Sequence, residues 1–103
     1  MASTPEGKIK RKIMRLLVDV NYDKRIYFFM AVPMGFGKRT VDYLLCVNGC
    51  FVAIEAKAPG EKPTDKQAAV LQEVRDAGGT TFVVRDDESL AELAAWLKEA
   101  NRE

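Results

Sequence analysis

The 103 residues include 16 lysines and arginines against 15 aspartates and glutamates, so the chain carries almost no net charge, and no overall field attracts polyanions from a distance. With no histidine and only two cysteines, the chain cannot build a zinc site or a histidine-based catalytic triad. It has no apolar run of about 18 residues that could span a membrane and no secretory signal at the N-terminus. We therefore expect one small cytoplasmic domain over residues 1–103.

A helix is predicted to begin at Ser3-Thr4-Pro5-Glu6 and to end near Val20. A hydroxyl cap, a proline in the first turn and an acid at the positive end of the helix dipole are typical of a helix start. Apolar residues then recur at helical spacing. They form an inward stripe of Ile9, Ile13, Leu16, Leu17 and Val20.

Glu6 lies at the same helical phase as this stripe. It is either a capping acid or a further acid beside a metal ion. The other side of the helix is basic, and we interpret it as a solvated face in preference to a phosphate-binding surface. Its cations are Lys8, Lys10, Arg11, Lys12 and Arg15.

Residues 26–32 form a continuous apolar run that predicts a strand buried on both faces. The loop over residues 33–40 follows it and brings together two glycines and two cations. This loop is either an ordinary connection or a clamp for a phosphodiester backbone, and we favour the clamp. Because no Gly-x4-Gly-Lys-Ser/Thr pattern occurs, we expect no nucleotide cofactor. The residues assigned to nucleic-acid binding are Gly35, Gly37, Lys38 and Arg39.

A hairpin is predicted over residues 41–57, where two apolar and β-branched runs are joined by Asn48-Gly49. Asn-Gly favours a two-residue type I′ turn, because both central residues need a positive φ. That turn sets the register, which pairs Val47 with Cys50 and, at the open end, Asp42 with Glu55. We interpret the two cysteines, Cys46 and Cys50, as reduced core residues.

The open end of this hairpin gathers two carboxylates and an ammonium group. Directly opposed acids repel each other, and Lys57 points to the same face as Glu55 because side chains alternate along a strand. Two carboxylates at this spacing suit Mg²⁺, which is usually held by one or two carboxylates together with waters and phosphate oxygens. The alternative is a plain salt bridge between Lys57 and Glu55 or Asp42.

A second helix is predicted over residues 64–77, after a turn at residues 58–63. Thr64 and Gln67 have the spacing of a capping box, and Gly78-Gly79 ends the helix. Gln67 lies at the phase of the inward stripe, so its amide can point toward the sheet. The stripe consists of Val70, Leu71, Val74 and Ala77.

Residues 80–85 predict a fourth strand, parallel to the one that carries Glu55 because a helical crossover connects them. A last helix begins among Asp86, Asp87 and Ser89, with Trp96 beside its apolar stripe as a packing residue or dimer contact. That stripe consists of Leu90, Leu93, Ala94 and Leu97. The order αβββαβα predicts the α/β class, with a mixed sheet between helices.

The chain resembles the PD-(D/E)XK nuclease superfamily and, within it, a stand-alone VRR-NUC domain. The similarity covers about two-thirds of the chain. It departs from the superfamily pattern at Val41, where the superfamily name expects proline. The matching stretches are Pro33-x-Gly-x-Gly before Val41-Asp42, Phe51-Val52-Ala53-Ile54-Glu55-Ala56-Lys57-Ala58-Pro59, Asp65-Lys66-Gln67 and Ala77-Gly78-Gly79.

The resemblance implies a restriction-endonuclease-like core and the hydrolysis of DNA. Asp42 and Glu55 would bind Mg²⁺ or Mn²⁺ with the backbone carbonyl of Ala56, and Lys57 would be catalytic. Gln67 and Glu6 would complete the catalytic set, Glu6 as a possible further metal ligand. The implied substrate is branched DNA, such as a four-way junction or a flap, cut by a homodimer. The alternative is a non-catalytic nucleic-acid-binding or assembly module with the same fold.

Overall fold

The computed structural model describes residues 4–20, 25–30 and 41–100, without the side chains of Phe29 and Met30. Its element order confirms the predicted αβββαβα. The elements are α1 (Pro5–Val20), β1 (Ile26–Met30), β2 (Tyr43–Val47), β3 (Cys50–Ala56), α2 (Asp65–Asp76), β4 (Thr80–Val84) and α3 (Asp87–Ala100).

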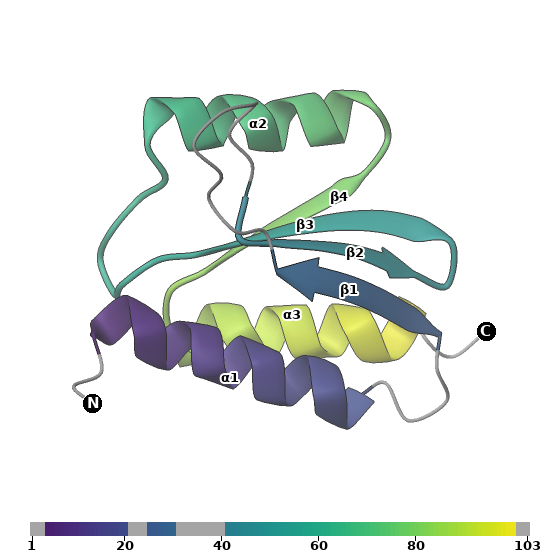
Figure 1. Ribbon diagram of the computed structural model, residues 1–103, viewed down its shortest axis with the longest axis horizontal. Coiled ribbons are helices and arrows are strands. Elements are labelled where there is room, and N and C mark those ends of the chain that lie inside the picture. Colours follow the sequence, from purple (N-terminus) through teal and green to yellow (C-terminus); the bar gives the residue numbers. More distant parts are fainter. Residues whose placement is uncertain (1–3, 21–24, 31–40, 101–103) are drawn as a thin grey trace.

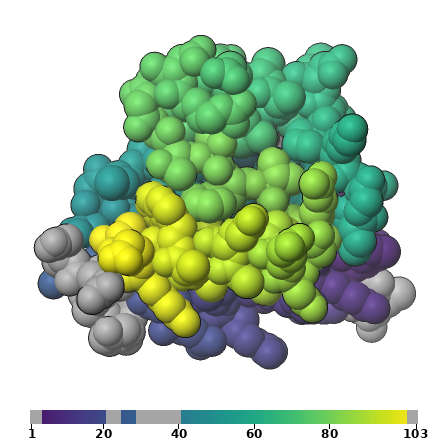
Figure 2. Space-filling view, turned by 180° about the vertical axis from the view of Figure 1, so that it is seen from behind, coloured from purple at the N-terminus to yellow at the C-terminus, as the bar shows by residue number. Residues whose placement is uncertain are grey.

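The four strands form one mixed sheet in the order β1-β2-β3-β4. The first three strands are antiparallel neighbours, and β4 is parallel to β3, as the helical crossover predicted. Figure 1 shows α2 on one face of the sheet and α1 with α3 on the other. From the reverse side, α3 lies between α2 above and α1 below (Figure 2). The predicted fold class, a mixed sheet flanked by helices, is confirmed.

The β2–β3 hairpin has the predicted turn and register. Asn48 has a φ of 49° and Gly49 a φ of 90°, as a type I′ turn requires. Backbone pairs then run from Val47 and Cys50 at the tip to Tyr43 and Ile54. One step farther along, Asp42 and Glu55 reach the open end of the hairpin together.

The main core lies between the sheet and the α1/α3 pair. Alternation along the strands directs Tyr43, Leu45 and Val47 of β2 to this side, where all three are buried. A smaller core beneath α2 contains Val41, Ala53 and Leu71. Phe82 and Trp96 pack edge-on with ring centroids 5.5 Å apart, so the predicted packing role of Trp96 is confirmed.

Helix α2 has defined caps at both ends. The side chain of Thr64 accepts a hydrogen bond from the backbone N–H of Gln67, and the Gln67 side chain accepts one from the backbone N–H of Thr64. At the other end Gly78 has a φ of 97°, and the N–H of Gly79 donates to the carbonyl of Val74. These contacts orient α2 where the chain leaves β3 and where it enters β4.

We expect Thr64→Ala to lower the free energy of unfolding by about 1 kcal/mol, since the substitution leaves an N-terminal amide of α2 without its acceptor. Urea unfolding monitored by circular dichroism would measure the change. Thr64→Ser keeps a hydroxyl acceptor and serves as the control. An alanine variant as stable as the serine variant would contradict a stabilising cap.

Three burial predictions are wrong. Cys46 and Cys50 are free thiols, as predicted, but both are exposed instead of lying in the core. Strand β1 is not buried on both faces, because Tyr27 is 73% exposed. Ala77 is exposed as the C-cap of α2. Tyr27 and Cys46 are exposed because α2 contacts mainly β3 and β4, so the side chains of β1 and β2 on the α2 face are less covered. Cys50 instead follows the hairpin turn directly, at the end of the sheet.

Within residues 4–20, 25–30 and 41–100, no helix combines the length and the apolar composition that crossing a bilayer requires.

Candidate active site

Asp42 and Glu55 meet at the open end of the β2–β3 hairpin. The backbone N–H of Asp42 donates to Oε1 of Glu55 at 3.3 Å, and the backbone N–H of Ala56 donates to Oδ2 of Asp42 at 2.8 Å. Each acid is therefore held by the backbone of the opposite strand segment. The hairpin register, which the Asn-Gly turn sets, brings the two carboxylates together.

Lys57 lies on the same face as Glu55, as strand alternation predicted. Its Nζ is 3.6 Å from Oε2 of Glu55, and the two side chains are only 12% and 3% exposed. A buried charge is costly unless it is paired, and this ion pair offsets part of the cost of burying the two groups. The cluster predicted from the sequence is formed.

Burial, and then the neighbouring charge of Asp42, raises the pKa of Glu55 from 4.5 to about 7. The Lys57 ammonium and the hydrogen bond from the Asp42 backbone oppose this rise but do not cancel it. Glu55 therefore changes its charge near neutral pH. A carboxylate in this state binds a proton readily and gains from any added positive charge beside it.

Lys10 of α1 also belongs to this site, although the sequence analysis placed it on a solvated outer face. Its Nζ lies 3.5 Å from Oδ1 of Asp42 and 3.4 Å from Oε2 of Glu6, and its side chain is 37% exposed. Partial burial lowers the pKa of Lys10, but the charges of Asp42 and Glu6 and hydrogen bonds with them outweigh that effect and raise it. That placement of Lys10 was wrong.

A hydrogen bond from Tyr43 fixes α1 against the hairpin. The hydroxyl of Tyr43 donates to the backbone carbonyl of Lys10 at 3.1 Å, and the Tyr43 side chain is fully buried. Burial, and then the charge of Asp42, raises the pKa of Tyr43 to about 12, so the hydroxyl remains a donor. No sequence motif marked Lys10 and Tyr43, and only the phase of α1, which directs Glu6 inward, could have indicated Lys10.

The structure places the remaining predicted site residues differently with respect to Asp42 and Glu55. Glu6 is linked to Asp42 through Lys10. Gln67 uses its side-chain oxygen to cap α2, and its catalytic role stays a prediction. The residues proposed to bind nucleic acid lie outside the described part of the chain. They are Gly35, Gly37, Lys38 and Arg39.

The donor set at the hairpin end fits a hard divalent cation. Among the described residues, no three histidine, cysteine, aspartate or glutamate side chains gather closely enough to hold a metal ion by themselves. Mg²⁺ does not require three, because it is usually held by one or two carboxylates plus waters and substrate phosphate oxygens. Asp42 and Glu55 would supply those carboxylates, and a cation beside them would relieve the repulsion between the two acids.

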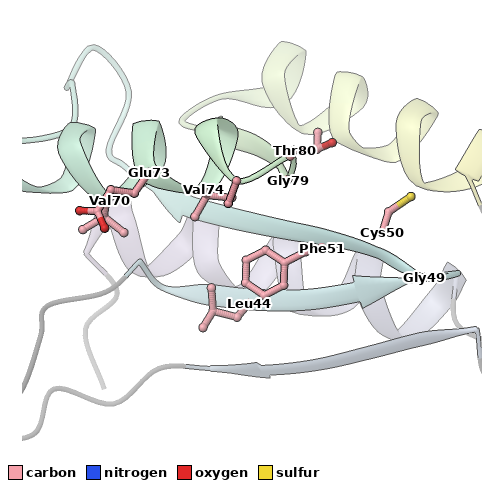
Figure 3. Close-up of a pocket in the computed structure, with 11 residues that line it drawn as sticks. Leu44, Gly49, Cys50, Phe51, Val70, Glu73, Val74, Gly79 and Thr80 are labelled. Carbon is pink, nitrogen blue, oxygen red and sulfur yellow. The ribbon is translucent and has the colours of Figure 1, made fainter.

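A separate cavity of about 680 Å³ lies at the opposite end of the hairpin, beneath the C-terminal half of α2. Its apolar wall includes Leu44 and Phe51 of the hairpin and Val70 and Val74 of α2, with Glu73 at its edge (Figure 3). None of the predicted catalytic or metal-binding residues lines it. The candidate site is therefore the charged cluster and not this apolar cavity.

No protein-family model matches the chain, and no curated protein matches it at a significant level. Membership of the PD-(D/E)XK superfamily accordingly remains a proposal that depends on the residues described above.

Proposed function

We propose that this protein is a Mg²⁺- or Mn²⁺-dependent nuclease that hydrolyses phosphodiester bonds in DNA. The observation that carries the proposal is the cluster of Asp42, Glu55 and Lys57, in which a buried carboxylate of raised pKa lies beside a second carboxylate and a lysine. Such perturbed groups are concentrated at functional sites. The order of the three residues along the hairpin agrees with the nuclease pattern that the sequence resembles.

In this proposal each residue has a separate task. Asp42 and Glu55 hold the cation, which would polarise the scissile phosphate and lower the pKa of a bound water. Glu55 must be ionised to serve as a ligand, so the apparent affinity of the site for the cation should increase as the pH rises through about 7. Lys57 orients the attacking water or donates to the negative charge that develops on the phosphate.

Branched DNA is the substrate class that we favour. The near-zero net charge argues against strong binding to any duplex, because non-specific affinity comes mainly from neutralising phosphates. Binding through a local surface that fits a particular DNA shape is more consistent with this charge. A two-fold homodimer would suit paired incision of a four-way junction.

The second candidate function is a non-catalytic nucleic-acid-binding or assembly module. The observation that favours it is that Lys10 and Lys57 already pair with Asp42 and Glu55, so the acids are partly neutralised without a metal. In such a module the ion pairs would be purely structural. Thermal unfolding with and without Mn²⁺ distinguishes the two functions, because a ligand that binds the folded state stabilises it.

The nuclease is tested with labelled single-stranded, duplex, flap and four-way-junction DNA in Mg²⁺ or Mn²⁺. We expect cleavage to fall by on the order of a hundredfold or more in Asp42→Asn and Lys57→Met, because each loses a charge that acts on the transition state. Asp19→Asn and Lys62→Met carry the same substitutions at exposed positions and should cleave like the wild type.

The pattern of products identifies the substrate. Symmetric paired nicks in the junction would support a dimeric resolvase, whereas a preference for flaps would indicate a repair function. If wild-type protein cuts none of these substrates and shows no stabilisation by Mn²⁺, the enzyme proposal is wrong and the binding module replaces it.

A further inference from the structure

We propose that the ammonium group of Lys10 forms an ion pair with Asp42 in the metal-free protein and that the divalent ion displaces it from Asp42 on binding. This inference rests on the proposed metal site. It assigns a positioning role to a residue of α1 that lies outside the catalytic set implied by the sequence. Lys10 would keep Asp42 oriented and neutralised before the metal arrives, and would lower the affinity of the site for that metal.

The two oxygens of Asp42 have different partners, and this difference identifies the one that a metal would take. Oδ2 accepts the backbone N–H of Ala56 at 2.8 Å, within the hairpin. Oδ1 faces the Lys10 ammonium at 3.5 Å. A metal ion bound to Oδ1 would therefore lie next to a positive charge. Since like charges at such a distance repel strongly in a partly buried site, the ammonium and the metal compete for this oxygen.

Lys10 also has an alternative partner in place. Oε2 of Glu6 lies 3.4 Å from its Nζ, one turn earlier on the same helix. The backbone of Lys10 is anchored separately, because its carbonyl accepts the hydroxyl of the buried Tyr43. The ammonium can thus leave Asp42 for Glu6 without any movement of α1, and Glu6 prevents the displaced charge from being left unpaired.

The test is a titration of Mn²⁺ without DNA, read as the shift in unfolding temperature, so it does not depend on catalysis. Lys10→Met keeps the length of the side chain and removes the competing charge. We expect it to bind Mn²⁺ about tenfold more tightly than the wild type, the size of effect expected when a neighbouring like charge is removed from a partly exposed site. Lys10→Arg keeps the charge and should bind Mn²⁺ like the wild type.

Lys12→Met is the matched control. Lys12 lies on the same helix and also forms an ion pair, 2.9 Å from Oδ1 of Asp87 at the start of α3, away from Asp42. We expect this variant to lose a little stability equally with and without Mn²⁺. Lys10→Met should instead be less stable than the wild type only in EDTA, and the difference should disappear at saturating Mn²⁺.

The outcomes separate this inference from the function on which it rests. If Mn²⁺ stabilises the wild type, but Lys10→Met binds it no more tightly than Lys12→Met does, Lys10 is only a structural ion pair and the inference is wrong. Weaker Mn²⁺ binding by Lys10→Met would also overturn it. If Mn²⁺ does not stabilise the wild type at all, the metal site itself is wrong, and the proposed function fails with it.

Discussion

Glu55→Gln is expected to lower DNA cleavage by on the order of a hundredfold or more and, at pH 8 in EDTA, to make the protein more stable than the wild type. The Glu55 side chain is only 3% exposed, and burial together with the adjacent Asp42 raises its pKa from 4.5 to about 7. Folding above pH 7 therefore includes the cost of a buried, poorly compensated negative charge. Glutamine resembles the protonated acid in shape and can still accept the backbone hydrogen bond of Asp42, but it carries no charge.

The direction of the pH dependence follows from this raised pKa. Between pH 4.5 and 7 the folded protein holds a proton on Glu55 that the unfolded chain has already released. The free energy of unfolding of the wild type should therefore fall as the pH rises through this interval, by about 2–3 kcal/mol in total. Below pH 4.5 both states are protonated, and this contribution no longer changes with pH.

Urea unfolding in EDTA at pH 5 and pH 8 tests the stability part of the prediction. We expect wild type and Glu55→Gln to be similar at pH 5 and to differ by about 2–3 kcal/mol at pH 8. Glu61→Gln, at an exposed position, should match the wild type at both values. If the difference in stability between Glu55→Gln and the wild type is the same at pH 8 as at pH 5, Glu55 does not carry a destabilising buried charge.

Cleavage and metal binding test the functional part on the same variant. Removing an anionic ligand should lower activity by on the order of a hundredfold or more, since even groups that only support a metal ligand contribute 10- to 100-fold. Mn²⁺ should raise the unfolding temperature of the wild type far more than that of Glu55→Gln. A variant that is more stable but inactive would mean that the site retains a destabilising charge because its chemistry requires it.

Leu17→Ala is expected to lower the free energy of unfolding by about 2–5 kcal/mol. Leu17 is fully buried in the main core, where α1 packs against the sheet and α3. Truncating it removes apolar contacts and leaves a cavity. For a domain of this size, whose total stability is about 5–15 kcal/mol, that loss is a large fraction. Because α1 carries Lys10 and Glu6, loosening it should also weaken the charged site.

The next residue along the chain is the control for this substitution. Val18 is 61% exposed, so Val18→Ala should change the free energy of unfolding by less than about 0.5 kcal/mol. Thermal and urea unfolding of the two variants, measured in parallel, give the comparison. Equal effects at the two positions would mean that α1 is not packed on the sheet as described.

The parts of the fold that were predicted correctly depend on local interactions. Few turn types other than type I′ suit Asn48-Gly49, so this dipeptide was enough to predict the hairpin and its register. The Thr64 and Gln67 capping box and Gly78 set the ends of α2 for the same reason. Because the hairpin register is local, the meeting of Asp42 and Glu55 could also be predicted before any tertiary contact was known.

The parts that were predicted wrongly depend on which element covers which surface. Cys46 and Tyr27 lie in apolar runs of strand length, which are typical of buried strands, but α2 does not cover their part of the sheet. Their exposure follows from the length and position of a helix that begins about 20 residues beyond Cys46. The hydrophobic pattern of a strand cannot supply that information, since it shows which side chains are apolar but not which helix packs over them.

By itself, the sequence determined the element order, the hairpin register and the grouping of two carboxylates with Lys57, because each arises from neighbours along the chain or across one turn. The tertiary structure alone decided that Lys10 joins them. Its ammonium meets Asp42 only when α1 packs on the sheet and Tyr43 holds the Lys10 carbonyl. Contacts between residues so distant in sequence form through burial of the shared core, and no local pattern encodes them.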